Sequence, residues 1–227
     1  MVTELTSAAE VAGAGRAAAD RRCRAMAACL AAEEAVCAAQ QAAGRVVLRR
    51  LRGAPADPPI VAADHTVTFG AWATVGAPQL QIAGKAFFEV ELLELKQYCS
   101  PQFGWASAAF ATSAEYSDRG VGDDAHSFGV DGERSMKWHG GPPEGGTPFD
   151  TKWVTGDVLG FAADPEAGRL LFAHNGEWRV AFDGVRSAAG GLHPALTGKN
   201  MRLRANFGDR GWAHGPPDAS YTAAAGR

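Results

Sequence analysis

Two carboxylates in one strand-like segment are the first residues whose type and spacing could support catalysis. Glu89 and Glu91 are two residues apart in the alternating segment Ala86 to Leu95, so both would lie on one face of a strand. Paired carboxylates on a sandwich strand act as acid and nucleophile in some glycosidases. The series ends at two, because Leu93 follows. We interpret the pair as the polar side of a solvated strand face and predict no catalytic residue there.

Four aspartates between residues 118 and 131 could offer oxygen ligands to a hard cation. Asp118, Asp123, Asp124 and Asp131 are spread over a predicted loop and strand, without the spacing of a calcium-binding loop. The six histidines are scattered, and no two cysteines have the Cys-x-x-Cys spacing of a zinc site. Gly-x-Ser-x-Gly and phosphate-loop signatures are also missing from the sequence. We therefore predict no metal, no cofactor and no enzymatic activity.

Charge differs between the two parts of the chain. Residues 1–52 contain eight arginines and five acids, net +3, whereas residues 53–227 contain 14 basic and 20 acidic residues, net −6. An acidic domain binds a phosphate backbone poorly, so nucleic acid is not expected as a partner. No apolar run approaches the ~18 residues of a membrane span, and the first residues lack a signal-peptide pattern. We expect a cytoplasmic or nuclear protein without membrane association, and interpret its four cysteines as reduced thiols.

Composition divides the chain into four segments. Residues 1–52 are rich in alanine and free of proline, which predicts a helical extension. Residues 53–59 are a Pro/Gly linker, residues 60–214 a β domain, and residues 215–227 a flexible C-terminal tail.

The helix expected from about Ala17 to Ala43 carries a thin apolar stripe. Cys23, Leu30 and Cys37 recur every seven residues, but Glu33 falls where a coiled coil would require an apolar side chain. We weigh an amphipathic helix that packs on its own domain, a coiled coil through which the chain associates with itself or with a partner, and a disordered segment.

Residues after 60 have the pattern of an all-β sandwich, because short apolar runs are separated by Gly, Asp and Pro. Phe88, Val90 and Leu92 would share one face of their strand. Asn175-Gly176 between two apolar runs predicts a two-residue hairpin. The expected strands are Thr66 to Phe69, Ala86 to Leu95, Gln102 to Ala111, Ser127 to Val130, Met136 to Trp138, Val158 to Ala163, Leu170 to Ala173, Trp178 to Phe182 and Leu203 to Phe207.

Seven motifs in one order resemble the SPRY domain family. They are Gly84 to Glu91, Phe103 to Ala106, Gly122 to Asp131, Trp153 with Gly156 to Gly160, Asp164 to Phe182, His193 to Leu196 and Asn206 to Gly208. The resemblance implies a mainly β fold, a two-sheet antiparallel sandwich of concanavalin-type jelly-roll architecture. Trp105 and Trp153 would fill the space between the sheets. Arg179 stands where the family has glycine, which suggests a wider hairpin after Asn175.

The resemblance also implies a non-catalytic interaction module, an adaptor that recognises a partner protein or a short peptide. Loops at one end of the sandwich bind partners in this family, and here they would be those after Trp72, after Cys99, around Tyr116 and before Met201. Tyr116 matches a tyrosine that contacts the peptide in some members. The candidate residues around it are Thr74, Val75, Ser100, Arg119, Lys199 and Asn200.

A lectin-like sandwich that binds carbohydrate is the alternative function. Jelly-roll lectins share the expected architecture, and an exposed Trp178 or Trp212 could stack on a sugar ring. The other interpretation of both tryptophans is that they pack at the edge of a sheet.

Overall fold

The computed structural model divides the chain into two units, residues 1–45 and residues 46–227. In the first unit, residues 15–28 are helical and overlap the predicted helix. Cys23 of the predicted stripe is exposed, as is the nearby Met26, whereas Leu30 and Cys37 lie outside the described residues. The structure describes residues 15–28, 31–32, 35, 46–53, 57–82, 84–112, 118–141, 146–185 and 191–224.

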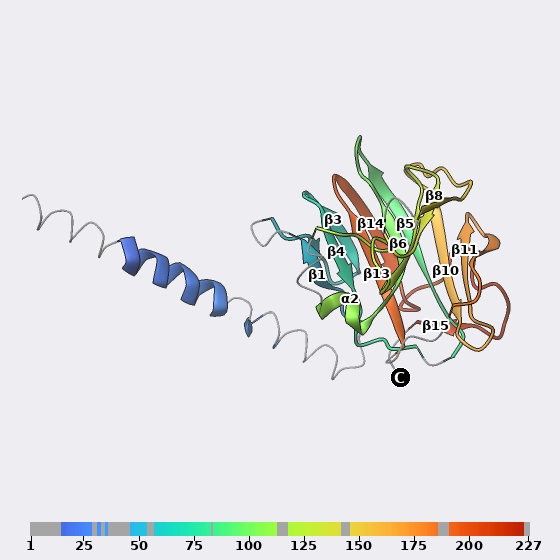
Figure 1. The fold of residues 1–227 in the computed structure, drawn as a ribbon, viewed down its shortest axis with the longest axis horizontal. Coiled ribbons are helices and arrows are strands. Elements are labelled where there is room, and N and C mark those ends of the chain that lie inside the picture. Colours follow the sequence, from blue (N-terminus) through green and yellow to red (C-terminus); the bar gives the residue numbers. More distant parts are fainter. Residues whose placement is uncertain are drawn as a thin grey trace, which may run out of the picture. The chain divides into compact units, whose positions relative to one another are not determined.

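The second unit is a sandwich of two sheets, and Figure 1 shows their strands side by side. We call the sheet with strand order β1-β4-β13-β6-β7-β8-β9 the first sheet. Its strands are β1 (Arg49–Gly53), β4 (Ala73–Gly76), β13 (Leu192–Gly198), β6 (Gln102–Ser107), β7 (Ser127–Asp131), β8 (Met136–Trp138) and β9 (Gly146–Pro148). All of these pairings are antiparallel.

The second sheet has the order β12-β11-β10-β5-β14-β3-β2. Its strands are β12 (Glu177–Phe182), β11 (Arg169–His174), β10 (Val158–Asp164), β5 (Ala86–Leu95), β14 (Met201–Asn206), β3 (Thr66–Phe69) and β2 (Ile60–Val61). A short strand, β15 (Thr222–Ala223), pairs in parallel with the start of β5. The predicted fold class, a mainly β two-sheet sandwich with an N-terminal helix, is confirmed.

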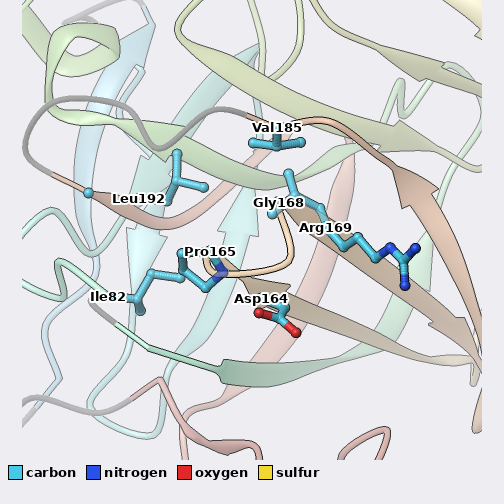
Figure 2. Close-up of a pocket in the computed structure, with 9 residues that line it drawn as sticks. Ile82, Asp164, Pro165, Gly168, Arg169, Val185 and Leu192 are labelled. Carbon is cyan, nitrogen blue, oxygen red and sulfur yellow. The ribbon is translucent and has the colours of Figure 1, made fainter.

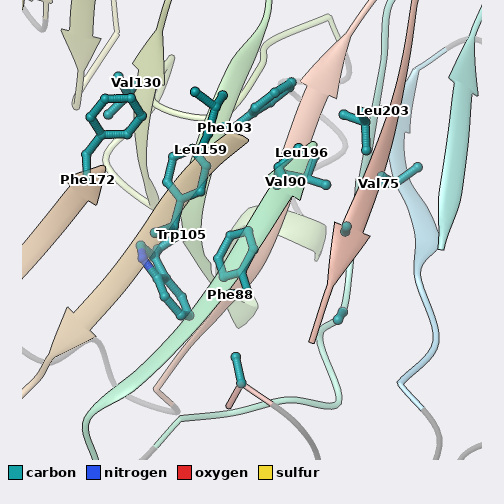
Figure 3. Close-up of a cluster of buried hydrophobic side chains, with 14 of the residues drawn as sticks. Val75, Phe88, Val90, Phe103, Trp105, Val130, Leu159, Phe172, Leu196 and Leu203 are labelled. Atoms are coloured by element: carbon teal, nitrogen blue, oxygen red, sulfur yellow. The ribbon is translucent and has the colours of Figure 1, made fainter. Parts of the chain in front are cut away.

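The core lies between the two sheets and is built from the alternation that the sequence predicts (Figure 3). Phe88, Val90 and Leu92 of β5 are all fully buried. The Phe88 ring meets Trp105 from the first sheet edge to face, with ring centroids 5.1 Å apart. Trp153 stacks on Phe103 at 5.1 Å. Both tryptophans therefore fill the space between the sheets as predicted, and such aromatic pairs add to the stabilisation that burial provides.

Both ends of the β domain differ from the predicted boundaries. The second unit begins at Val46, and residues 49–53 form β1 against β4 instead of ending a helical extension. The expected flexible tail also contains ordered contacts, because Thr222 pairs with Ala86, and Tyr221 is only 8% exposed. The sequence of β1 lacks the alternation of apolar residues from which a strand is predicted, because charged residues such as its arginines are typical of exposed sheet edges.

The strand predicted from Gln102 to Ala111 ends early. Strand β6 stops at Ser107 and is followed by a short helix, α2 (Ala108–Thr112). Alanine favours this change of structure, since it loses no side-chain entropy in a helix. The buried Phe110 of α2 packs with Ala106, Val121 and Ala195 on the outer face of the first sheet. No helix in the described part of the chain is long and apolar enough to cross a membrane.

The hairpin between β11 and β12 has the two-residue turn that its sequence predicts. His174 pairs with Glu177, and Asn175 and Gly176 have φ angles of 50° and 88°. The wider hairpin expected from Arg179 is therefore wrong. The Arg179 side chain instead lies over the Phe149 ring, 4.0 Å from its centroid, and links the edges of the two sheets.

Candidate functional site

Four connections between strands meet at one end of the sandwich, which we call the loop end: residues 70–72, 96–101, 118–124 and 199–200. Backbone hydrogen bonds join three of them. The N–H of Lys199 donates to the Cys99 carbonyl at 3.0 Å, the N–H of Asn200 to Gly70 at 3.3 Å, and the N–H of Lys96 to Asn200 at 3.1 Å. Because these bonds connect backbones from different loops, they hold the loops in one arrangement.

The connection 118–124 joins the loop end through a carboxylate and a hydroxyl. Asp123 accepts hydrogen bonds from the Gln102 side-chain amide and from the Gly120 N–H, both at 2.8 Å. The N–H of Val121 donates to Oγ1 of Thr197 at 3.0 Å. A Cβ atom at Gly120 would lie 2.0 Å from Oε1 of the buried Gln102 and 2.8 Å from the Trp72 ring, so a larger residue here would require both side chains to move.

Tyr98 is the most prominent side chain at the loop end. It is 66% exposed, and its φ of 61° lies in the left-handed region that residues other than glycine rarely adopt. Ser100 also has a positive φ, 41°, and its N–H donates to Oε2 of Glu133 at 2.6 Å. Backbone strain of this kind persists only where the surrounding structure maintains it. Such positions cluster at functional sites.

Cys99, between these two residues, is buried and is not a reactive thiol. Burial raises its pKa, and the nearby carboxylates of Glu133 and Asp131 raise it further. The thiol therefore stays protonated near neutral pH, which makes it a poor nucleophile.

The structure brings together some of the predicted site residues and buries others. Ser100, Lys199 and Asn200 are partly exposed and adjoin one another at the loop end. Arg119 is exposed there, and its Nη1 donates to the Asp123 carbonyl at 3.3 Å. Tyr116 lies outside the described residues.

Thr74 and Val75 are corrections to the predicted site. Both are fully buried in β4, which lies between β1 and β13 in the first sheet. The Thr74 hydroxyl bonds Oγ1 of Thr197 at 2.8 Å, and Val75 is part of the core. Neither side chain is therefore available to a partner on this surface.

Sequence reasoning missed Tyr98, although a signal was present. The alternation of β5 ends at Leu95, and an aromatic residue follows in a polar segment, Lys96-Gln-Tyr-Cys-Ser100. A large aromatic side chain outside the periodic pattern has no predicted place in the core, so it is a candidate for contact with a partner.

Three of the four aspartates, Asp123, Asp124 and Asp131, accept hydrogen bonds within the protein. Asp124 pairs with Arg52 and accepts hydrogen bonds from His126 and Ser127, while Asp131 accepts from the N–H groups of Glu133 and Arg134. No group of three or more potential metal-ligating side chains occurs among the described residues.

Glu89 and Glu91 do not form the solvated pair that the sequence suggests. Glu89 is 3% exposed, and its carboxylate accepts hydrogen bonds from the N–H groups of Ala213, His214 and Gly215, each at 2.9 Å. Glu91 forms an ion pair with Arg204 at 2.6 Å, in which each side chain is 37% exposed. Glu89 thus anchors the segment 209–224, which we call the C-terminal strap, on the outer face of the second sheet.

The two tryptophans of the lectin alternative lie on this covered face. Trp212 packs on Phe87 with ring centroids 4.3 Å apart, and Nε1 of Trp178 donates to the Gly215 carbonyl at 3.3 Å. A Cβ atom at Gly160 would lie 2.7 Å from the Trp178 ring, so the close approach of this indole ring explains the glycine. Both rings are partly covered, which favours the interpretation that they pack on the sheet.

A small pocket lies at the opposite end of the sandwich (Figure 2). It adjoins Asp164, the last residue of β10, and Leu192, the first residue of β13, whereas the loop end adjoins the other ends of these strands. Its apolar lining comes from Ile82, Pro165, Leu170, Val185 and Leu192. The cavity measures about 10 Å³, which is room for about one water molecule.

Comparison of the sequence and the structure with known proteins identifies a family. The SPRY domain family matches residues 85–210. E3 ubiquitin-protein ligase RKP of Arabidopsis thaliana is 33% identical over 129 residues, which are 55% of this chain and 9% of that protein. The crystal structure of the SPRY domain of human HERC1 has a TM-score of 0.54 at 15% identity, over 67% of this chain and 94% of that chain. At this identity the HERC1 domain shows a likeness of fold.

Proposed function

This chain belongs to the SPRY domain family, and from that premise we propose that it binds a partner protein or peptide through the loop end. SPRY domains are generally protein-interaction modules. Ligase activity is a property of the Arabidopsis protein, of which the matched region is only 9%. For this chain we propose a non-catalytic adaptor.

Tyr98 is the observation that supports this proposal most directly. A tyrosine offers a large contact area with few rotatable bonds and one hydroxyl group, so it binds at low entropic cost. Hydrogen bonds from Lys199 to Cys99 and from Ser100 to Glu133 hold the backbone on its C-terminal side. A preorganised aromatic side chain is typical of the anchor residues of protein interfaces.

Ser100, Lys199, Asn200 and Arg119 would surround this anchor, and Tyr116 remains a predicted contact on the connection before 118–124. Charged and polar side chains around a central aromatic residue resemble the rim of an interface. We therefore expect a peptide ligand with an apolar side chain that packs on Tyr98 and polar groups that face the rim.

A peptide-display selection on the intact chain, followed by calorimetric titration of the selected peptide, tests the proposal. Tyr98→Ala should weaken binding by about 2 kcal/mol, or roughly 30-fold in Kd. Val180→Ala is the matched control, because Val180 is a 44% exposed apolar residue on β12. If the wild type and Tyr98→Ala bind the peptide with equal affinity, the proposal that the peptide binds the loop end at Tyr98 is rejected.

The same chain applied to a glycan panel tests the lectin alternative. Binding of a glycan that is lost in Trp178→Ala and retained in Tyr98→Ala would support carbohydrate recognition on the other face. Self-association through the helix at residues 15–28 also stays a prediction, and the molar mass from light scattering tests it.

A further inference from the structure

Arg52 makes an unusual number of contacts for an arginine on an edge strand. It is 5% exposed, and its Nη2 donates to Oδ2 of Asp124 at 2.7 Å and to the Phe110 carbonyl at 2.7 Å. Nε also donates to the Phe110 carbonyl at 3.0 Å, and Nη1 donates to the Arg119 carbonyl at 3.4 Å. The guanidinium group lies 3.4 Å from the centroid of the Phe110 ring.

These contacts bracket one connection of the loop end. Phe110 belongs to α2, and Arg119 lies at the start of the connection 118–124, so one side chain binds the carbonyl groups on both sides of residues 111–118. The planar guanidinium group can bind several acceptors at once, which a lysine ammonium group at the same place cannot match. Arg52 therefore holds two points of the chain, the Phe110 carbonyl in α2 and the Arg119 carbonyl in the connection 118–124.

Asp124 gives the guanidinium group a fixed partner on its other side. Its Oδ1 accepts from the His126 N–H at 2.9 Å and from the Ser127 hydroxyl at 3.1 Å, while Oδ2 binds Arg52. The side chains of the ion pair are only 2% and 3% exposed. A buried charge pair of this kind contributes little net stability but costs much when one partner is removed.

A bulge in β1 directs Arg52 toward these partners. The pairing register of β1 with β4 shifts between Arg50 and Arg52, which leaves Leu51 as the extra residue. In a regular strand Leu51 and Arg52 would point to opposite faces, but Leu51 packs against the cluster that contains Phe110, and Arg52 bonds Phe110 as well. Bulges commonly re-aim a side chain next to a functional site.

We propose that Arg52 is a positioning residue of the partner-binding site: from the edge strand β1 it holds the connection 118–124 in place through the Arg119 carbonyl and the Asp124 carboxylate. This inference rests on the proposed function of the loop end. Strand β1 directly follows the first unit, and it pairs with β4 on one side only among the described residues.

The test separates this positioning role from general stability. Arg52→Met leaves Asp124 buried without its partner and should lower the melting temperature. The double variant Arg52→Met with Asp124→Asn removes the unpaired charge, so its melting temperature should return toward that of the wild type. The carbonyl groups of Phe110 and Arg119 still lack their donor in the double variant.

Amide hydrogen exchange at residues 118–124, and trypsin cleavage after Arg119, report on this connection directly. Both should be at least about tenfold faster in the double variant than in the wild type. Arg52→Lys, which keeps a charge for Asp124, should show the same local change. Arg50→Met is the control, because Arg50 is an exposed neighbour on β1. Wild-type exchange and cleavage rates in the double variant would overturn the inference.

Titration with the peptide selected on the wild-type chain completes the experiment. Weaker binding by the double variant, with exchange also faster, supports the inference. Faster exchange with unchanged binding would overturn the positioning role for the site, although the contacts of Arg52 with the connection 118–124 would hold. If Tyr98→Ala and the double variant both bind like the wild type, the proposed function of the loop end fails instead.

Discussion

The two outer faces of the sandwich are covered in complementary ways. On the second sheet, the buried carboxylate of Glu89 accepts hydrogen bonds from three N–H groups of the C-terminal strap. On the first sheet, the buried guanidinium group of Arg52 donates to two carbonyl groups of the cover formed by α2 and residues 118–124. Each side chain therefore supplies hydrogen-bond partners to backbone groups of the segment that covers its sheet.

The two covers differ in the strand that anchors them. Glu89 belongs to β5, which pairs with β10 and β14 on its two sides, whereas Arg52 belongs to the edge strand β1. An edge strand separates from its sheet at lower cost than a central one, because fewer hydrogen bonds and contacts hold it. We therefore expect the strap to stay in place until the whole domain unfolds, and the cover next to the loop end to change without global unfolding.

Glu89→Gln should give the largest loss of stability and sharpens this comparison. A glutamine offers one acceptor oxygen and faces the remaining N–H with a donor, so we expect unfolding to become easier by about 3 kcal/mol. Urea unfolding measures this loss. Amide exchange at residues 118–124 should change only as much as global stability does, since Glu89 contacts the other face.

Glu91→Gln is the matched control, two residues along the same strand. Its ion pair with Arg204 is more than one-third exposed, so its loss should cost less than about 1 kcal/mol. Equal losses of stability in the two variants would contradict the anchoring role of Glu89. Faster amide exchange at residues 118–124 in Glu89→Gln, without a loss of global stability, would contradict the proposed difference between the two covers.

The first sheet itself also contains a buried group without a hydrogen-bond partner among the described residues, in strand β13, and this predicts a pH dependence. His193 is fully buried, and neither ring nitrogen has a hydrogen-bond partner among the described residues. Burial, followed by the charge of Arg49, lowers its pKa from 6.5 to about 4. The unfolded chain therefore binds the proton more readily than the folded chain between these two pH values.

Stability should accordingly fall as the pH is lowered from about 6.5 toward 4. At pH 5 the expected loss from this one group is about 2 kcal/mol. His193→Leu removes the titration, so its urea midpoint should fall less than that of the wild type between pH 7 and pH 5. Parallel pH profiles of the two proteins would contradict this prediction and show that the imidazole has a partner in solution.

The sequence predicts the parts of the fold that depend on local pattern. Alternation identifies the core face of β5, and Asn175-Gly176 identifies a hairpin with its register, because both signals concern neighbouring residues. Strand β1 has no such signal, since a bulge and three arginines break its alternation.

The candidate site is harder to predict because its properties depend on distant partners. Glu89 bonds N–H groups more than 120 residues away, and the burial of Thr74 follows from strands on both sides of β4. The exposure of Tyr98 likewise depends on loops from other parts of the sequence. Spacing alone indicates none of these contacts, whereas the family resemblance does indicate which loops meet.

Tyr98→Asn should give the smallest change in stability, and with the opposite sign. Asparagine tolerates left-handed backbone better than tyrosine does, so relief at φ 61° should stabilise the fold by about 0.5–1 kcal/mol. The same variant should lose affinity for the selected peptide, because the aromatic ring is gone. Urea unfolding and calorimetry on one preparation measure both effects. A destabilised variant would show that Tyr98 supports the fold, whereas higher stability with lower affinity would show that the protein maintains strain here in order to present the ring.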